Sequence, residues 1–224
     1  MKNVLFATLA TSLATTLLAH SPGSHAALII NEVDYDQPGR DTAEFIELYN
    51  TGADSLSLDG YLIDLINGNN GSVYRSIDLS GFSLNGGGYF VVCNDATQVM
   101  NCDYEFTTSS SWLQNGAPDA IALYDGNGLI DSLAYEGLMP GFTEGDALTL
   151  ADSNSVTMSL GRINDIDSNN NLADFQANCL TPGAANILGS GDCSTASVSP
   201  VPVPPALWLF ASGLLGLVKI SRRE

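Results

Sequence analysis

The sequence predicts an all-β protein, with antiparallel strands arranged as a sandwich or a barrel. Three observations point to this fold class. Short apolar runs rich in β-branched and aromatic residues recur from residue 28 to about residue 166. Turn-forming residues, including Asn-Gly and Asp-Gly pairs, separate these runs. No segment before residue 205 shows a helical period of useful length, so helices are not expected in the domain.

The first two strands are predicted by the apolar runs 28–33 and 44–50, which flank a turn-rich segment at 36–41. Within the second run, Ile46 and Leu48 lie on one side of the pleat, and the intervening residues lie on the other. This alternation indicates a strand with one face in a core and the other partly exposed to water.

The remaining strands follow from apolar runs between turns. The clearest signal is the Asp-Gly-Asn-Gly sequence at 125–128, which predicts a hairpin between the runs on either side of it. Further strands are expected at residues 56–66, 73–79, 89–93, 120–124, 129–133 and 156–160.

The N-terminal residues 1–26 have the composition of a secretory signal peptide. Lys2 gives a positive start, residues 4–19 are apolar, and Ser24-His25-Ala26 is a small-x-small cleavage site. A membrane anchor is the alternative, but the run is short and rich in threonine. Export is therefore expected, with one domain over residues 27–188 that is large enough to bury a core.

The C-terminal part changes composition twice. Residues 189–200 are rich in Gly, Ser, Thr and Pro, which predicts a linker. Residues 205–220 are apolar and predict a transmembrane segment. As a helix, the fifteen residues 206–220 reach about 22 Å, short of the roughly 30 Å hydrocarbon core, so that Lys219 has to extend its charged end to the interface.

The charge of the domain excludes some classes of partner. The domain holds three of the seven basic residues, Arg40, Arg75 and Arg162, but nearly all of the 25 acidic ones. Such a surface repels nucleic acid, favours cations and keeps an exported protein soluble. The domain also lacks lysine and histidine, which removes most nucleophile–base pairs and His-ligated metal sites. The composition therefore argues against an enzyme.

Four cysteines, Cys93, Cys102, Cys179 and Cys193, allow three disulfide pairings in an exported protein. Pairing the neighbours in sequence gives Cys93–Cys102 and Cys179–Cys193, and this is the pairing expected. No C-x-x-C spacing occurs, so neither a zinc site nor a thioredoxin-type redox site is indicated.

One loop has the residue types of a calcium site, and Ca²⁺ is the one cofactor that the sequence suggests. Oxygen side chains recur at alternate positions, as in the loops that wrap this ion. The candidate ligands are Asp165, Asp167, Asn169, Asn171 and Asp174. Two departures from the EF-hand pattern are Asn170 in place of glycine and Gln176 in place of the bidentate acid. An Asp/Asn-rich loop that forms its own Asx-turns is the alternative.

Two further groups have simpler interpretations beside the functional ones. Glu32, Glu44 and Glu47 lie in or beside apolar runs and suggest paired carboxylates, but solvent-facing strand positions explain them better. Three loop aromatics could form a sugar-stacking platform, or could pack over one end of the fold. They are Tyr104, Phe106 and Trp112.

Several ordered motifs between about residues 28 and 186 resemble the lamin tail domain family. They are Ile30-Asn31-Glu32-Val33, Glu44-Phe45-Ile46-Glu47-Leu48-Tyr49-Asn50, Leu56-Ser57-Leu58-Asp59-Gly60-Tyr61, Gly87-Gly88-Tyr89-Phe90-Val91-Val92, Asp119-Ala120-Ile121-Ala122-Leu123-Tyr124-Asp125, Ser159-Leu160-Gly161-Arg162 and Thr181-Pro182-Gly183-Ala184-Ala185-Asn186. Tyr61 stands where many relatives have a tryptophan. The resemblance implies an immunoglobulin-like antiparallel β-sandwich and a module that binds or displays rather than catalyses.

The tail, residues 201–224, resembles the PEP-CTERM sorting signal that exosortase-type membrane proteases recognise. Three unlike parts occur in order: a proline-rich start, the apolar segment and two trailing arginines. The signal residues are Val201, Pro202, Val203, Pro204, Arg222 and Arg223. Val203 replaces the glutamate of the signal's name. The alternative is an ordinary C-terminal membrane anchor.

Together these features predict an exported, non-catalytic binding or structural module of a Gram-negative bacterium. It is expected to be held briefly in the inner membrane and then sorted to the cell surface or the extracellular matrix. Expected partners are the exosortase and an extracellular polysaccharide or surface protein. The rival interpretation is a secreted, Ca²⁺-assisted hydrolase that acts on polysaccharide or nucleic acid.

Overall fold

The structure, a computed structural model, describes residues 27–107 and 109–189. The predicted signal peptide and the tail beyond residue 189 lie outside the described residues. Thirteen strands, one short α-helix and one 3₁₀ turn make up the described part. They are β1 (Leu28–Asp34), β2 (Phe45–Asn50), β3 (Leu56–Ser57), β4 (Leu62–Asn67), β5 (Ser72–Asp78), β6 (Ser83–Leu84), β7 (Tyr89–Cys93), β8 (Tyr104–Glu105), β9 (Asp119–Asp125), β10 (Gly128–Tyr135), β11 (Ser159–Arg162), the 3₁₀ turn η1 (Ile163–Asp165), α1 (Asn171–Asp174), β12 (Phe175–Cys179) and β13 (Ile187–Leu188).

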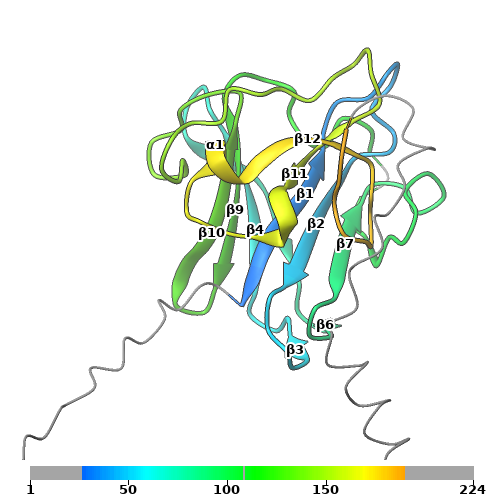
Figure 1. Cartoon of the computed structure of the whole chain (residues 1–224), viewed down its shortest axis with the longest axis vertical. Coiled ribbons are helices and arrows are strands. Elements are labelled where there is room, and N and C mark those ends of the chain that lie inside the picture. The colour runs from blue at the N-terminus through cyan, green and yellow to red at the C-terminus, as the bar shows by residue number, and fades with distance from the viewer. Residues whose placement is uncertain (1–26, 108, 190–224) are drawn as a thin grey trace, which may run out of the picture.

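The strands form an all-β sandwich, as predicted (Figure 1). One sheet has the order β13-β12-β11-β1-β2-β7-β8, and the other has the order β10-β9-β4-β5. A separate small sheet pairs β3 with β6. Neighbouring strands run antiparallel except β7 and β8, which run parallel. Strands from both ends of the described chain meet where β1 pairs with β11, so closing the sandwich depends on contacts between residues far apart in sequence.

Two predicted strands differ from the observed ones. The run 56–66 is not continuous, because it splits into β3 and β4. A turn separates them at Gly60, which has a φ of +82°, a conformation that glycine adopts without a steric penalty. The strand expected at 156–160 begins only at Ser159 and continues to Arg162 as β11.

The main core lies between the two larger sheets and is formed by alternating apolar side chains. Ile46 and Leu48 belong to it, as the pleat of the second run predicted. Other fully buried members include Leu28, Ile30, Val33, Ile63, Leu65, Ile77, Val92, Ile121, Leu123, Leu133 and Leu160.

A bulge in β1 changes which residues face the core. The register shifts between Ile30 and Glu32, so Asn31 is the extra residue. Ile30 and Val33 therefore both face the core although they are three positions apart. Glu32 therefore lies on the opposite face of the sheet.

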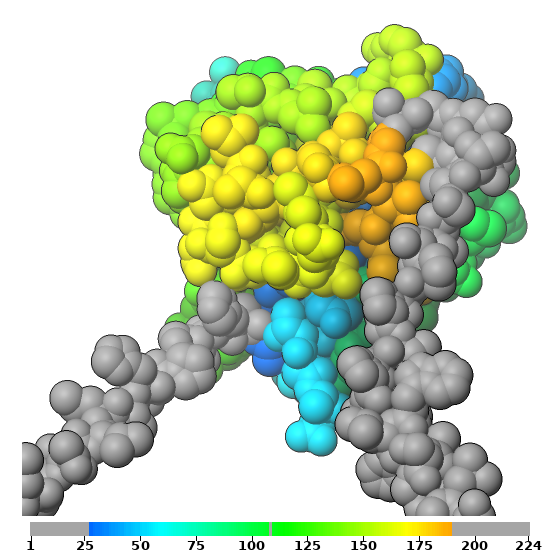
Figure 2. All heavy atoms as spheres, in the orientation of Figure 1, coloured from blue at the N-terminus to red at the C-terminus, as the bar shows by residue number. Residues whose placement is uncertain are grey.

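That opposite face is not exposed, and the prediction of solvent-facing glutamates is wrong. Glu32, Glu44 and Glu47 are all completely buried. Figure 2 shows the cause for one face of the molecule, where the yellow and orange residues late in the chain cover most of the blue β1. A strand pattern indicates which side chains share a face, but a distant segment decides whether that face is covered.

The predicted disulfide between Cys93 and Cys102 is present and joins the end of β7 to the segment before β8. Cys193 lies outside the described residues, so the Cys179–Cys193 pairing stays a prediction. Within the described ranges, no helix is both long and apolar enough to cross a membrane. The predicted segment 205–220 falls outside those ranges.

Candidate functional site

A group of buried charged side chains is centred on Arg162, the last residue of β11. Side chains two positions apart in a strand share a face, and Leu160 faces the core. Arg162 therefore points into the interior as well. The same rule places Asp131 of β10 on the face of the core residue Leu133. Both charged side chains are fully buried.

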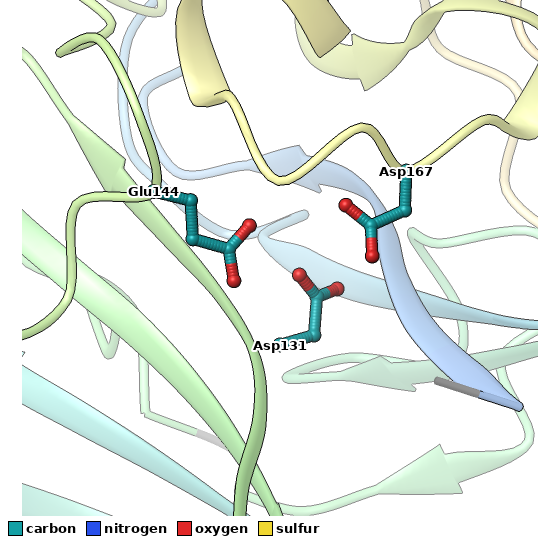
Figure 3. A group of neighbouring side chains, drawn as sticks. All are labelled: Asp131, Glu144 and Asp167. Carbon is teal, nitrogen blue, oxygen red and sulfur yellow. The ribbon is translucent and has the colours of Figure 1, made fainter. Parts of the chain in front are cut away.

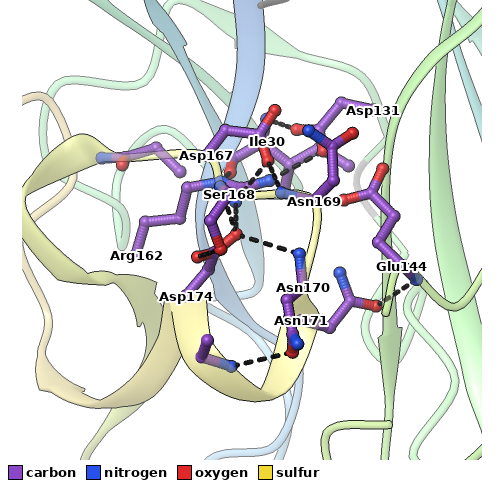
Figure 4. A network of polar contacts seen from close by, with 12 residues as sticks. Ile30, Asp131, Glu144, Arg162, Asp167, Ser168, Asn169, Asn170, Asn171 and Asp174 are labelled. Carbon is purple, nitrogen blue, oxygen red and sulfur yellow. Dashed lines mark hydrogen bonds and ion pairs between the residues drawn. The ribbon is translucent and has the colours of Figure 1, made fainter. Parts of the chain in front are cut away.

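The guanidinium of Arg162 is bonded on every side. Its Nε donates to the carbonyl oxygen of Ile30 at 2.6 Å, and its Nη2 pairs with Asp131 at 2.7 Å. Its Nη1 lies 2.9 Å from Asp174 and 3.3 Å from Asp167 (Figure 4). The ring of Phe175 lies against it, with 4.6 Å from the guanidinium carbon to the ring centre. One side chain thus joins β1, β10 and the loop after β11.

A fourth carboxyl group completes what we call the Arg162 cluster, which consists of Asp131, Glu144, Arg162, Asp167 and Asp174. Carboxylate oxygens of Asp131, Glu144 and Asp167 lie within 4.8 Å of one another, and Figure 3 shows these three groups turned toward a common point. Burial raises the pKa of Glu144 to about 7, and the nearby carboxylates of Asp131 and Asp167 contribute to that rise.

The cluster holds more negative than positive charge, because four carboxyl groups surround one guanidinium. Burial raises the pKa of Asp131, whereas the charge of Arg162 opposes that rise. The Oε2 atom of Glu144 is buried without a hydrogen-bond partner among the described residues. The excess negative charge can be reduced in two ways, by a proton on Glu144 or by a bound cation.

The candidate calcium ligands do not gather around one point. Asp167 joins the Arg162 cluster, but Asp165 accepts a hydrogen bond from the hydroxyl of Tyr89 at 2.9 Å. Asp174 is bonded to Arg162 and to the backbone N–H and hydroxyl of Ser168. The structure thus separates Asp165 from the other acids of the loop.

Asn169 and Asn171 have structural roles in hydrogen bonding. The N–H of Asn169 donates to Asp167 at 2.9 Å, which is the Asx-turn considered as the alternative to a metal loop. The buried carboxamide of Asn171 accepts from the N–H of Ala134 and donates to the carbonyl of Ser132. It thereby satisfies backbone groups at the free edge of β10, as a neighbouring strand would.

A family model described as Lamin Tail Domain matches residues 21–137, which is more than half of the 224 residues. The chain belongs to the lamin tail domain family. Among solved structures, the chain is similar to the crystal structure of a DUF4876 family protein from Bacteroides thetaiotaomicron. The alignment covers 78% of this chain and 74% of that chain, with 10% sequence identity and a TM-score of 0.39. No curated protein sequence matches the chain.

The match to the lamin tail domain ends at residue 137, and the sandwich continues beyond it. β11, β12 and β13 lie after the matched stretch, yet they complete the seven-stranded sheet. Arg162 belongs to this later part and bonds Ile30 and Asp131 of the matched part. The Arg162 cluster therefore connects the stretch that matches the lamin tail domain to the later part of the sandwich.

A second buried group of acids lies under residues 181–186, which we call the strap. Glu32 accepts hydrogen bonds from the hydroxyls of Ser159 and Thr181, at 2.5 and 2.7 Å. Glu47 accepts from Asn31 at 2.8 Å and from the N–H of Gly183 at 2.5 Å. Burial raises the pKa of Glu32 to about 7 and that of Glu47 to about 8.

These glutamates hold the strap rather than form an open catalytic pair, because no solvent reaches them. Glu44 has a comparable role elsewhere. It accepts from the backbone N–H groups of Trp112 and Leu113, and burial raises its pKa to about 8. The three glutamates considered for acid–base chemistry thus hold later segments of the sandwich in place.

The three loop aromatics pack against the core. Trp112 is 2% exposed, and its neighbours Tyr104 and Phe106 pack against the core. The packing alternative is therefore the correct one.

The sequence analysis did not identify Arg162, Asp131 or Glu144 as partners. A charged residue at a core-facing strand position was a usable signal for Arg162 and Asp131.

Proposed function

We propose that this lamin tail domain protein is an exported, non-catalytic module that an exosortase sorts to the surface or the extracellular matrix of a Gram-negative bacterium. The observation that carries the proposal is the order of the tail: prolines from Pro202, an apolar segment at 205–220, then Arg222 and Arg223. Trailing cations stay on the cytoplasmic side while the domain is exported. The signal-like residues 1–26 are the matching export element.

Two features of the domain support an extracellular module. The Cys93–Cys102 disulfide is of the kind that persists in oxidising compartments. The three glutamates considered for acid–base chemistry have structural partners instead, since Glu32, Glu44 and Glu47 hold backbone or hydroxyl groups of other segments. Family membership in the lamin tail domain adds to the case for binding or display.

Intact mass spectrometry of the protein from its native host tests this proposal. The expected product lacks residues 1–26 and ends between Val201 and Pro205. A matched control replaces Arg222 and Arg223 by alanine, which removes the trailing charges and is expected to reduce processing. A product that still ends in Arg222-Arg223-Glu224 would show a plain membrane anchor and overturn exosortase sorting.

A further inference from the structure

A polar cleft of about 760 Å³ lies at one end of the sandwich, and no residue of the two buried acid groups lines it. It is formed by three segments: the turn after β4, the loop before β9 and the neighbourhood of Asp41. The residues used below are Asp41, Asn67, Asn69, Gln114, Asn115 and Asp119.

The walls of the cleft are held in place by bonds between its own segments. Asp119 accepts a hydrogen bond from the N–H of Gly68 at 2.7 Å, and Asn67 donates to the side chain of Gln114 at 2.8 Å. The turn and the loop touch so closely that a Cβ on Gly68 would lie 1.6 Å from the carbonyl oxygen of Pro118. Only glycine permits this approach.

Gln114 is fixed more firmly than a surface side chain usually is. Its backbone N–H donates to the hydroxyl of Tyr74 at 3.2 Å, and its carbonyl accepts from the hydroxyl of Tyr135 at 3.0 Å. The preceding residue, Leu113, is bonded to Glu44. A site held in this way loses little conformational entropy when a ligand binds.

Several lining groups have donors or acceptors that no described residue uses. The whole carboxamide of Asn69 and the Nε2 group of Gln114 have no partner there, and neither does the Oδ1 atom of Asn115. Carboxamides offer donors and acceptors side by side, and carboxylates add acceptors. Such a mixture matches hydroxyl groups, which both donate and accept.

The charge and polarity of the lining narrow the ligand class. Asp41 and Asp119 line the cleft and no lysine or arginine does, so an anionic ligand would be repelled. Among the lining residues, only Leu113, Ala117 and Pro118 have apolar side chains, and Leu113 is buried. We propose that this cleft binds a neutral oligosaccharide through Asn69, Gln114 and Asn115.

The inference rests on the proposed function for its setting, since a surface module would meet neutral glycans outside the cell. Binding is expected to be weak, with a dissociation constant of about 1 mM, because the cleft is open and offers no exposed ring for stacking.

Titration of the full chain with a panel of neutral trisaccharides, namely maltotriose, cellotriose and xylotriose, tests the proposal by NMR or calorimetry. At least one should bind, and the anionic trigalacturonate should not. Gln114→Ala and Asn69→Ala should each weaken binding about tenfold, as expected for the loss of one or two hydrogen bonds. Gln98→Ala removes an exposed glutamine elsewhere and should leave binding unchanged.

Asn69→Ala keeps the test decisive if Gln114→Ala does not fold, because the Asn69 side chain bonds to no other described residue. Failure of all neutral trisaccharides to bind, equal binding by Asn69→Ala, or preference for trigalacturonate would each overturn the inference. None of these results involves processing of the tail. Correct cleavage without trisaccharide binding therefore refutes only this inference, and an intact tail refutes only the proposed function.

Discussion

The Arg162 cluster and the glutamates beneath the strap are both groups of buried carboxyl side chains, but they are stabilised in different ways. In the Arg162 cluster, a guanidinium at 2.7 Å from Asp131 compensates the negative charge. Beneath the strap, Glu32 and Glu47 lie against hydroxyl and amide donors, with no cationic side chain among their bonded partners in the described residues. The first group is stabilised by charge pairing and the second by neutral donors and protonation.

This difference gives the two regions different sensitivities to mutation and to pH. Removing the cation should damage the Arg162 cluster at any pH near neutrality, because it leaves several carboxylates without compensation. Raising the pH should act mainly on the glutamates beneath the strap, because burial keeps both of them protonated, whereas in the Arg162 cluster it acts on Glu144 alone. The following predictions test this contrast, in order of decreasing effect.

Replacing Arg162 with methionine should lower the free energy of unfolding by about 3–5 kcal/mol, since it breaks buried ion pairs and leaves Asp131 charged in the core. Urea unfolding with a fluorescence readout measures the change. Arg40→Met is the matched control, because Arg40 is exposed and makes one long contact with Ser110. A loss no larger than that of the control would contradict the role given to Arg162.

The free energy of unfolding should fall as the pH rises from about 5 to 8. The folded-state pKa values of Glu32 and Glu47, about 7 and about 8, lie above the ordinary glutamate value of 4.5. The folded state therefore holds protons that the unfolded state has released, so this stability is fully present below pH 4.5 and is lost as the pH rises through the folded pKa values.

Glu47→Gln tests that pH dependence directly. The glutamine side chain stays neutral, so at pH 8 the variant should be more stable than the original chain by about 4 kcal/mol, and near pH 5 the two should differ by less than about 1 kcal/mol. Asp54→Asn, at an exposed position, should not change the slope. An unaltered pH profile in Glu47→Gln would show that this glutamate does not carry the effect.

Thr181→Val should loosen the strap with a cost of about 1 kcal/mol, because it removes the 2.7 Å hydrogen bond to Glu32 and keeps the side-chain volume. Hydrogen exchange at the Gly183 amide, which is bonded to Glu47, should speed up more than exchange in β9. Thr42→Val, at an exposed threonine, is the control. Equal protection of Gly183 in both variants would contradict the fastening role.

Calcium should have the smallest effect, a rise in stability of about 0.4 kcal/mol when the ion concentration equals its dissociation constant. The structure sharpens the calcium hypothesis, because Asp167 lies beside the carboxylates of Asp131 and Glu144, whereas Asp165 is bonded to Tyr89. Asp167→Asn should abolish the rise in melting temperature, and Asp165→Asn should keep it. Calorimetry that finds no rise at millimolar Ca²⁺, or the same rise in Asp167→Asn, would exclude this site.

Much of the fold could be predicted because its signals are local. The hairpin of β9 and β10 follows from the Asp-Gly-Asn-Gly turn, and the short loop between Cys93 and Cys102 made their pairing the simplest choice. The split of 56–66 at Gly60 was missed, because an apolar run can hide a turn when one glycine adopts a positive φ.

The candidate sites were harder to predict, because their partners lie far apart in sequence. Arg162 lies 132 residues from Ile30 and 31 from Asp131, and Thr181 lies 149 residues from Glu32. No spacing rule connects such positions. The calcium interpretation relied on neighbours in one loop, yet the fold directs Asp165 and Asp167 to different partners.

The sequence by itself determined the all-β class, the position of most strands and turns, and the family resemblance, because strand periodicity and turn chemistry act over a few residues. Only the tertiary structure decided that Glu32 and Glu47 are buried beneath the strap and that Arg162 gathers three aspartates. Alternation assigns a side chain to one of two faces, but it cannot say which distant segment will cover that face. Burial by such segments raises the pKa values of Glu32 and Glu47, and contacts between distant segments pair Arg162 with its three aspartates.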